Sequence, residues 1–492
     1  MTNPIFLRHL WSDFSLHRLL ITPIVLAALF ILGSLTIGKS PQGLWHFVAS
    51  TGLGLFVVIV IIMGTWRACR SIPEQKVTRT WENIQLSSLS SWQIACGEVF
   101  GATAYYWYGG FICLATVALS LGIDTHTNKN IENITLILFL AAILIHATAM
   151  QLSLATSSTI ERMRPTSTAA CFFMAIIVPY LIKDLIDWNS ATLLASYPSS
   201  QIPDFHPVAW YDLHLTQASA TILSYSLMAI WALIGLNQAI RRELQMSTPV
   251  IVWAVFILFC LFYFSGFTYG IISISTYRNS IFIWPLNIIL GMFARTLPYS
   301  NESLYFNGNF LPLAFAFFLS IGFSYFMALW EPKDITQLRR FGWACQNRDW
   351  HNINSLFPRW LMTASITAIV GIVFLIAISF ERIANPFTLT IIGLSLFAMR
   401  DFGLILYLSL ERKGRRTVTV FVYFFILYFL VPGILSATGK QNWLFVFIPG
   451  QAPYLSAAII PPLLQALIIW PALTLRWRQL SHVTLEGLAL RS

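Results

Sequence analysis

Four ionisable side chains fall inside long apolar runs of this sequence, where a charge is costly: Glu98, His146, Arg400 and Asp401. Such residues in a membrane-spanning segment mark ion paths, proton relays or ligand counter-ions by default. Two interpretations of Arg400 and Asp401 stay open, a buried polar network or a helix that continues along the membrane surface. Because adjacent residues on a helix point about 100° apart, we expect the two to need separate partners.

Glu98 lies within the pattern Gly97-x-x-x-Gly101, and glycines at this spacing let another helix approach closely. We expect Glu98 to pair with a cytosolic arginine, Arg162 or Arg164, in preference to relaying protons.

Catalytic and metal-binding patterns are scarce. His146 is the one histidine deep in an apolar run, and we expect it to hydrogen-bond between helices, since haem ligation would want a second, facing histidine. The six cysteines contain no Cys-x-x-Cys pair, so neither a disulfide framework nor a metal site is indicated. No His-Glu-x-x-His or Asp-x-Asp pattern and no Gly-x-Ser nucleophile with a facing histidine supports an enzyme.

The stretch Gly33-Ser-Leu-Thr-Ile-Gly-Lys-Ser40 matches the phosphate-loop pattern in its letters. That motif requires a preceding strand and a following helix whose N-terminus faces the phosphate. Here it ends an apolar run and Pro41 follows, so we reject a nucleotide site. No cofactor is expected in this chain, and any ATP-driven step needs a separate polypeptide.

The composition indicates the class of protein. The chain of 492 residues is 57% hydrophobic, 15% aromatic and only 10% charged, whereas soluble domains carry about 25% charged residues. The apolar runs are continuous and lack the alternation typical of a membrane barrel. We therefore predict an all-α, polytopic transmembrane helix bundle.

Runs of about 20 apolar residues mark the predicted spans. They are 19–38, 44–66, 97–122, 133–157, 166–182, 215–238, 248–273, 310–330, 360–379, 385–407, 418–437 and 453–474. The segment 279–297 is a further candidate, but counting it spoils the charge topology, so we interpret it as a re-entrant or external surface helix.

With about twelve spans, most lysines and arginines fall on one side. This positive-inside bias predicts a multi-pass protein of the plasma (inner) membrane with both termini cytosolic. The net charge of +10 is then explained by topology, because the basic residues are scattered over many loops, and no nucleic-acid partner is needed.

The layout suggests two six-span halves, 1–245 and 246–492. In each half two spans are followed by the longest cytosolic loop, at 67–93 and at 331–359. The second loop mixes apolar and basic residues, and we expect an amphipathic helix at the membrane surface there.

Residues 74–98 form a polar stretch between two apolar runs. This stretch resembles the cytosolic coupling segment of ABC-type export permeases, which reads Thr-x-Glu, apolar positions, Ser/Thr-Pro-Leu-Ser, an aromatic or Pro, an acid or amide, Ile and a small-plus-basic pair. The matching residues are Thr80, Glu82, Leu89, Ser90, Trp92, Gln93, Ile94 and Gly97. Ser88 and Glu98 depart from the pattern, since the family usually has Pro and Lys at these positions.

The resemblance implies that the chain is the membrane permease of an exporter driven by a cytosolic ABC-type ATPase dimer, which binds the ATP. It places the ATPase-coupling segment at 74–93, with Glu74, Thr80, Trp81, Glu82, Leu86 and Trp92 as its candidate residues. If 331–359 docks as well, one chain serves an ATPase dimer; otherwise a homodimer or a second permease chain is needed. Membrane lipid is the remaining expected partner.

Helical periodicity gives independent support for a force-transmitting element here. Val77, Trp81 and Ile84 are expected on one helical face, with Arg79 and Glu82 on others. The serines at 87–91 offer helix caps before the next helix, which is expected to begin near Trp92.

A secondary transporter of the twelve-span major-facilitator type, working without an ATPase, is the alternative. Glu411-Arg-Lys-Gly-Arg-Arg416 resembles the D-R-x-G-R-R loop of that family, but Tyr407 stands where its glycine is expected, and a basic inner anchor explains the run. Acidic residues deep in spans, needed for ion coupling, are few. The apolar spans favour lipid-like or amphipathic cargo over ions.

Overall fold

The structure is a computed structural model that describes residues 3–34, 41–123, 130–157, 165–196, 207–211, 213–267, 311–331, 335–380, 385–409, 416–448 and 454–489. These residues are almost entirely helical, apart from one pair of short strands, β1 (Pro207–Trp210) and β2 (Leu213–Thr216). The prediction of an all-α membrane protein is confirmed. The candidate segment 279–297, Arg162 and Arg164 lie outside the described residues.

Contacts between residues divide the chain into two compact units, the first drawn mainly from Met1–Leu194 and His214–Thr248 and the second mainly from Pro249–Ser492. The helices before the strand pair and the helix after it are α1 (Pro4–Asp13), α2 (Leu16–Ser34), α3 (Pro41–Phe56), the π-helix η1 (Val57–Gly64), α4 (Thr65–Val77), α5 (Thr80–Gln85), α6 (Ser91–Gly101), α7 (Ala104–Ile123), α8 (Asn130–Ser157), α9 (Pro165–Ser196) and α10 (Gln217–Glu243).

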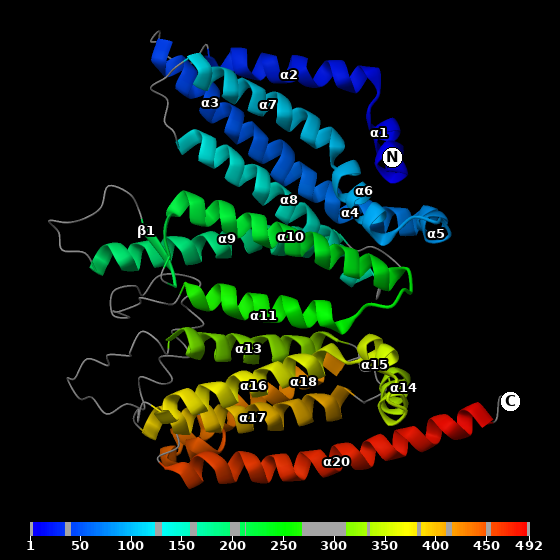
Figure 1. The fold of residues 1–492 in the computed structure, drawn as a ribbon, viewed down its shortest axis with the longest axis vertical. Coiled ribbons are helices and arrows are strands. Elements are labelled where there is room, and N and C mark those ends of the chain that lie inside the picture. The colour runs from blue at the N-terminus through cyan, green and yellow to red at the C-terminus, as the bar shows by residue number, and fades with distance from the viewer. Residues whose placement is uncertain are drawn as a thin grey trace. The chain divides into compact units, whose positions relative to one another are not determined.

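A continuous rod made of α3, η1 and α4 runs through the first unit (Figure 1). Its first part packs against α7, and its last part packs against α8, which also holds α10. The two short helices α1 and α5 lie at the same end of this unit, close to the junction of α4 and α6 (Figure 1). Polar residues of the sequence therefore gather at one end of an apolar bundle.

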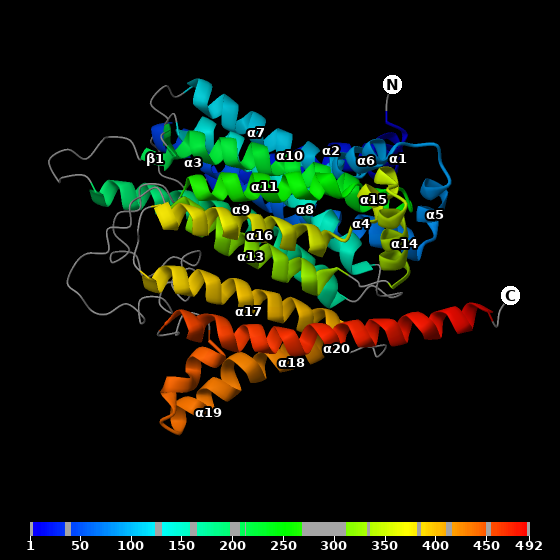
Figure 2. The same ribbon diagram turned by 60° about the horizontal axis from the view of Figure 1, so that its bottom comes forward.

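The second unit contains α11 (Val250–Gly266), α13 (Leu311–Trp330), α14 (Ile335–Gln346), α15 (Trp350–Leu356), α16 (Arg359–Phe380), α17 (Asn385–Ser409), α18 (Arg416–Phe425), the π-helix η2 (Ile426–Leu430), α19 (Val431–Ala437), the 3-10 helix η3 (Gln441–Val446) and α20 (Leu455–Ala489). Figure 2 shows α17 alongside α20, with α18 and α19 forming a bent arm beside them. Phe317 and Phe374 centre the packing of α13 on α16.

Eight helices of the described chain are long and apolar enough to cross a membrane. They are Leu16–Ser34, Phe47–Val77, Ile131–Ala155, Thr168–Asp187, Gln217–Glu243, Arg359–Ala377, Ile392–Ser409 and Leu455–Gln479. Two consecutive helices, Ser91–Gly101 and Ala104–Ser120, would add a ninth span, although they meet at a bend of 53°.

The other three predicted spans coincide with apolar stretches of at most 17 residues: Val250–Gly266, Leu313–Leu329 and Val422–Ala437. The second of these stretches lies within α13, whose 20 residues are about 30 Å long, the thickness of the hydrocarbon core. The multi-pass character is thus plain in the structure, and the number twelve stays a prediction.

Helix α2 illustrates why these elements belong in lipid. Only 6% of its apolar segment is buried by the rest of the protein. Leu20, Ile24 and Leu32 are among its exposed side chains. A helix that is apolar on nearly every face and unburied is stable only in an apolar solvent.

Candidate functional site

The predicted coupling segment contains a short helix, α5, which connects two longer helices, α4 and α6. Helix α4 ends at Val77, and the chain reverses through Arg79, whose φ of 59° is left-handed. Helix α5 covers Thr80–Gln85, and α6 begins at Ser91. Ser90 caps α6 in a capping box, in which its hydroxyl accepts from the Gln93 N–H and the Gln93 side chain accepts from the Ser90 N–H.

The two faces of α5 differ sharply in exposure. Trp81 (3% exposed) and Ile84 face the protein, whereas Glu82 is exposed and Leu86 is 87% exposed. Trp92, on the first turn of α6, is also exposed.

The expectation that Val77 shares one face with Trp81 and Ile84 is wrong. Val77 is exposed, because α4 ends at this residue and the turn at Arg79 redirects the chain before α5 begins. Helical periodicity does not carry across a chain reversal.

Polar contacts tie α5 to the end of α10. The Lys76 ammonium lies 2.9 Å from the Glu243 carboxylate, and the Gln85 side chain donates to the Glu243 backbone carbonyl at 3.0 Å. Thr80 donates to the Gln75 carbonyl at 3.3 Å. Helices α4, α5 and α10 are therefore joined at one end of the first unit.

Glu74 has a different surrounding from the rest of the segment. Its carboxylate accepts from Arg67 at 2.7 Å and from Arg70 at 2.8 Å, all on α4. Glu74 thus offsets the positive charge of two arginines on its own helix, α4. It precedes α5 in the chain and is not on the exposed face of α5.

Beside α5 lies a buried polar cluster around Glu98, whose side chain is fully buried. The carboxylate accepts from Arg8 at 3.0 Å and from His9 at 3.2 Å, both on α1. From α4, Ser71 donates at 2.6 Å and Gln75 donates at 3.0 Å. Through these four contacts the buried carboxylate joins α6 to α1 and α4.

Helix α1 packs close enough to contact Glu98 because the positions of α6 that face it are the glycines Gly97 and Gly101. A Cβ atom at Gly97 would lie 2.8 Å from the Ile5 Cβ, and one at Gly101 would lie 2.9 Å from the His9 ring. The glycine pattern thus does admit a helix, namely α1. Within the described residues Glu98 pairs with Arg8. Arg162 and Arg164, the partners expected from the sequence, lie outside those residues.

In the second unit, Arg400 and Asp401 are buried together, at 1% and 0% exposure. The Arg400 Nε and Nη2 donate to Asp401 Oδ1 at 2.8 and 2.7 Å. The surface-helix interpretation is therefore wrong and the buried-network interpretation holds. The expectation of separate partners is corrected too, because the long arginine side chain folds back onto its neighbour.

Three further helices complete this network. Tyr428 on η2 accepts from Arg400 at 2.7 Å and donates to Asp401 at 2.6 Å. Tyr325 on α13 donates to Asp401 at 2.6 Å, and Gln465 on α20 accepts from Arg400 at 2.6 Å. The network joins four elements of the second unit, and a π-helix supplies one of its members, as π-helices often do at functional positions.

His146 has the structural role expected from the sequence. It is buried on α8, and its Nε2 lies 2.9 Å from the Val60 carbonyl in η1. The Trp107 ring meets it edge-on at 5.8 Å. Among the residues that the structure describes, no group of histidine, cysteine and acidic side chains could hold a metal ion.

The loop 331–359 forms two helices, α14 and α15, in place of the single amphipathic helix that was expected. Asp349 caps α15 by accepting from the Asn352 N–H, and the rings of Phe341 and Phe357 pack 5.1 Å apart. Trp343 and Trp350 are exposed, so this segment also presents large apolar side chains.

Sequence reasoning missed most partners of the buried charges, notably Arg8, His9, Tyr325, Tyr428 and Gln465. Only Arg8 carried a usable signal, as an arginine close to a predicted span. Tyrosine and glutamine inside apolar runs are common enough to pass unnoticed, although each brings a polar group that has to be satisfied in lipid.

No protein-family model matches this chain, and no curated protein or solved structure is significantly similar to it.

Proposed function

We propose that this protein is the transmembrane permease subunit of an ATP-driven exporter of the ABC type, working with a separate cytosolic ATPase dimer. The observation that carries the proposal is α5, a short helix with an exposed outer face, fixed between two membrane-embedded helices. The ATPase supplies the nucleotide site, and this chain contributes no cofactor. Its similarity to the coupling segment of export permeases rests on the residues from Thr80 to Gly97.

The contacts of α5 suit it to transmitting force. A push on Glu82 or Leu86 moves the buried Trp81 and Ile84, and with them the joined ends of α4 and α10. The capping box at Ser90 passes the same displacement into α6. Packed helices move as rigid elements, so a small motion at α5 reaches the far side of the unit.

In this proposal the chain has twelve spans in two six-span halves, 1–245 and 246–492, with both termini in the cytosol of an inner membrane. The exposed tryptophans of α14 and α15 make 331–359 the candidate second docking element for the ATPase dimer. The cargo is lipid-like or amphipathic, since the spans carry few fixed charges.

Affinity purification of the detergent-solubilised full chain from its native membrane, followed by mass spectrometry, tests this function. The exposed positions define the docking variant Glu82→Arg with Leu86→Asp, which leaves the buried side of α5 intact. The matched control is Glu132→Arg, an exposed charge reversal at the start of α8, away from α5 (Figure 1). Trp81→Ala serves as a separate variant that damages the fold of the segment.

An ABC-type ATPase recovered with the wild type and the control, but lost with the docking variant, supports both the function and the site. An ATPase retained by the docking variant moves the docking site to 331–359. A folded protein that brings no ATPase contradicts the proposal.

A second candidate, the secondary transporter, is favoured by one observation. Arg400 and Asp401 form an ion pair inside an apolar helix, with two tyrosine hydroxyls on the carboxylate, and intramembrane charges serve ion coupling in such proteins. Residues 411–415 of the basic run lie outside the described chain. If no ATPase copurifies, transport that depends on the proton gradient and is lost in Asp401→Asn protein that is still folded identifies this class.

A further inference from the structure

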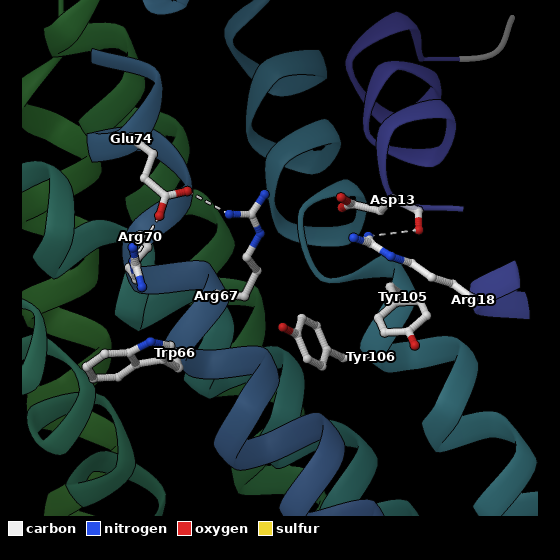
Figure 3. A pocket seen from close by; sticks show the side chains of 8 residues that line it. All are labelled: Asp13, Arg18, Trp66, Arg67, Arg70, Glu74, Tyr105 and Tyr106. Carbon is white, nitrogen blue, oxygen red and sulfur yellow. Dashed lines mark hydrogen bonds and ion pairs between the residues drawn. The ribbon is translucent and has the colours of Figure 1, made fainter. Parts of the chain in front are cut away.

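A pocket of about 470 Å³ opens in the first unit between the α1–α2 junction, α4 and the start of α7. Three arginines, two carboxylates and three aromatic side chains line it (Figure 3). Apart from Glu74, its lining residues lie outside the segment proposed to contact the ATPase, so the pocket is separate from that segment.

The pocket carries an excess of positive charge. Arg18, Arg67 and Arg70 face only two acids, Asp13 and Glu74, which leaves one net positive charge. Two of the arginines share one carboxylate, since Arg67 and Arg70 both donate to Glu74. A guanidinium has five N–H donors, so each retains donors for an anion in the pocket.

Arg18 approaches from another helix. Its Nη1 donates to the Asp13 backbone carbonyl at 3.4 Å, a long hydrogen bond. Figure 3 shows Arg18 extending toward the pocket from α2, while Arg67 and Arg70 extend from α4. Arginines that converge from separate elements form the usual site for a phosphate group, which accepts several charge-assisted hydrogen bonds at once.

The pocket lies where the helices change from polar to apolar. On α2, Arg18 is followed within two residues by the exposed Leu20, and on the rod Trp66 follows the exposed Met63. With 19 residues, α2 is about 28 Å long, close to the thickness of the hydrocarbon core. Arg18, near its first turn, is therefore at the level of the lipid headgroups.

The aromatic lining is typical of that level. Trp66, Tyr105 and Tyr106 face the pocket, and tryptophan and tyrosine concentrate at the membrane–water boundary. The Tyr105 hydroxyl lies 2.8 Å from the Thr22 hydroxyl on α2, which fixes one wall. Along the rest of α2, the exposed apolar side chains provide a surface for acyl chains.

We propose that this pocket binds the phosphate of one anionic membrane phospholipid, whose acyl chains lie along α2. A soluble phosphate ester shares the headgroup chemistry, but the apolar surface beside the arginines selects the lipid. Basic pockets between membrane helices bind anionic headgroups for the same electrostatic reason. This site does not depend on the exporter function, and it stands equally if the chain is a secondary transporter.

Native mass spectrometry of the full-length protein in detergent tests the site, with phosphatidylglycerol and phosphatidylcholine of equal acyl length titrated separately. We expect one phosphatidylglycerol to bind about tenfold more tightly than phosphatidylcholine. Arg18→Gln should weaken phosphatidylglycerol binding about tenfold, and Arg18→Lys should recover part of it, since lysine keeps the charge without the planar donors. Arg242→Gln, an exposed arginine at the end of α10, is the matched control and should leave binding unchanged.

Glu74→Gln should change the affinity for phosphatidylglycerol in the opposite direction. It removes the carboxylate shared by Arg67 and Arg70, so phosphatidylglycerol binding should tighten several-fold, a gain that damage to the fold cannot produce. Where Arg18→Gln fails to fold, Arg70→Gln tests the other wall, because Arg67 keeps its bond to Glu74.

Competition with inorganic phosphate and glycerol phosphate distinguishes a site for a lipid headgroup from a site for a soluble phosphate. Binding of phosphatidylglycerol that persists in millimolar phosphate supports the lipid site. Displacement of the lipid by soluble phosphate at similar concentration, equal binding of the two lipids, or unchanged binding in both arginine variants would overturn it.

Discussion

The buried pair Arg400–Asp401 shows what a single charge requires in an apolar interior. Each hydrogen-bonding group of the pair meets a partner, through Tyr325, Tyr428 and Gln465. Removing one member of a buried ion pair leaves the other charge uncompensated, whereas removing both leaves only the neutral polar groups of Tyr325, Tyr428 and Gln465 without partners.

We therefore expect Asp401→Asn and Arg400→Met each to lower the free energy of unfolding by about 3–5 kcal/mol. The double variant Arg400→Met with Asp401→Leu should lose less than either single variant. Unfolding in mixed micelles of increasing denaturing detergent measures all three. Single variants as stable as the wild type would contradict the paired network.

Arg79 is the second residue whose conformation makes a prediction. Its φ of 59° is left-handed, which is unfavourable for a side chain with a Cβ and acceptable for glycine. Arg79→Gly should raise the free energy of unfolding by about 1 kcal/mol. Arg70→Gly, inside α4, should lower it by about 1 kcal/mol or more, because glycine in a helix interior is unfavourable.

At the scale of elements, the docking of α1 on α6 depends on two glycines. A Cβ added at position 101 would lie 3.2 Å from the Phe6 Cα. Phe6 Cα belongs to the backbone, so it cannot move aside as the end of a flexible side chain can. The same contact brings Arg8 and His9 to Glu98. The small residues thus position a buried carboxylate cluster.

Gly101→Leu should detach α1, which is measured as faster hydrogen exchange across Pro4–Asp13 while α8 and α10 keep their protection. Gly54→Leu is the matched control, since a Cβ at Gly54 would meet no atom within 4 Å. Equal exchange of α1 in the two variants would show that the glycine contact does not hold this helix.

At the scale of the whole molecule, the charges of the loops predict the topology. The structure shows a multi-pass helical protein, and the distribution of lysines and arginines predicts that Leu86 faces the cytosol and Glu132 the outside. Both residues are exposed, so each is accessible to a label on its own side.

Single cysteines at these two positions, in a variant lacking the six native cysteines, test this prediction in intact cells. Glu132→Cys should react with a membrane-impermeant maleimide from outside, and Leu86→Cys should react only after the membrane is opened. The reverse pattern would place α5 outside and remove its contact with any cytosolic ATPase.

The class of protein and much of its local structure follow from the sequence alone. Hydropathy over about 20 residues is a property of a contiguous segment, so the apolar runs correctly indicated membrane helices. The start of α6 was predicted within a residue, because a helix cap depends on neighbours such as Ser90 and Gln93. The number of spans was harder to predict, since the bend between α6 and α7 and the short apolar helices depend on packing.

Only the tertiary structure decided which groups meet. Glu98 pairs with Arg8 across 90 residues of sequence, and Arg400 bonds to Gln465 across 65. Such partners are chosen by which helices pack side by side, and a one-dimensional pattern does not contain that information. The turn at Arg79 likewise decided that Trp81 faces inward while Val77 does not, because side-chain direction follows the path of the backbone.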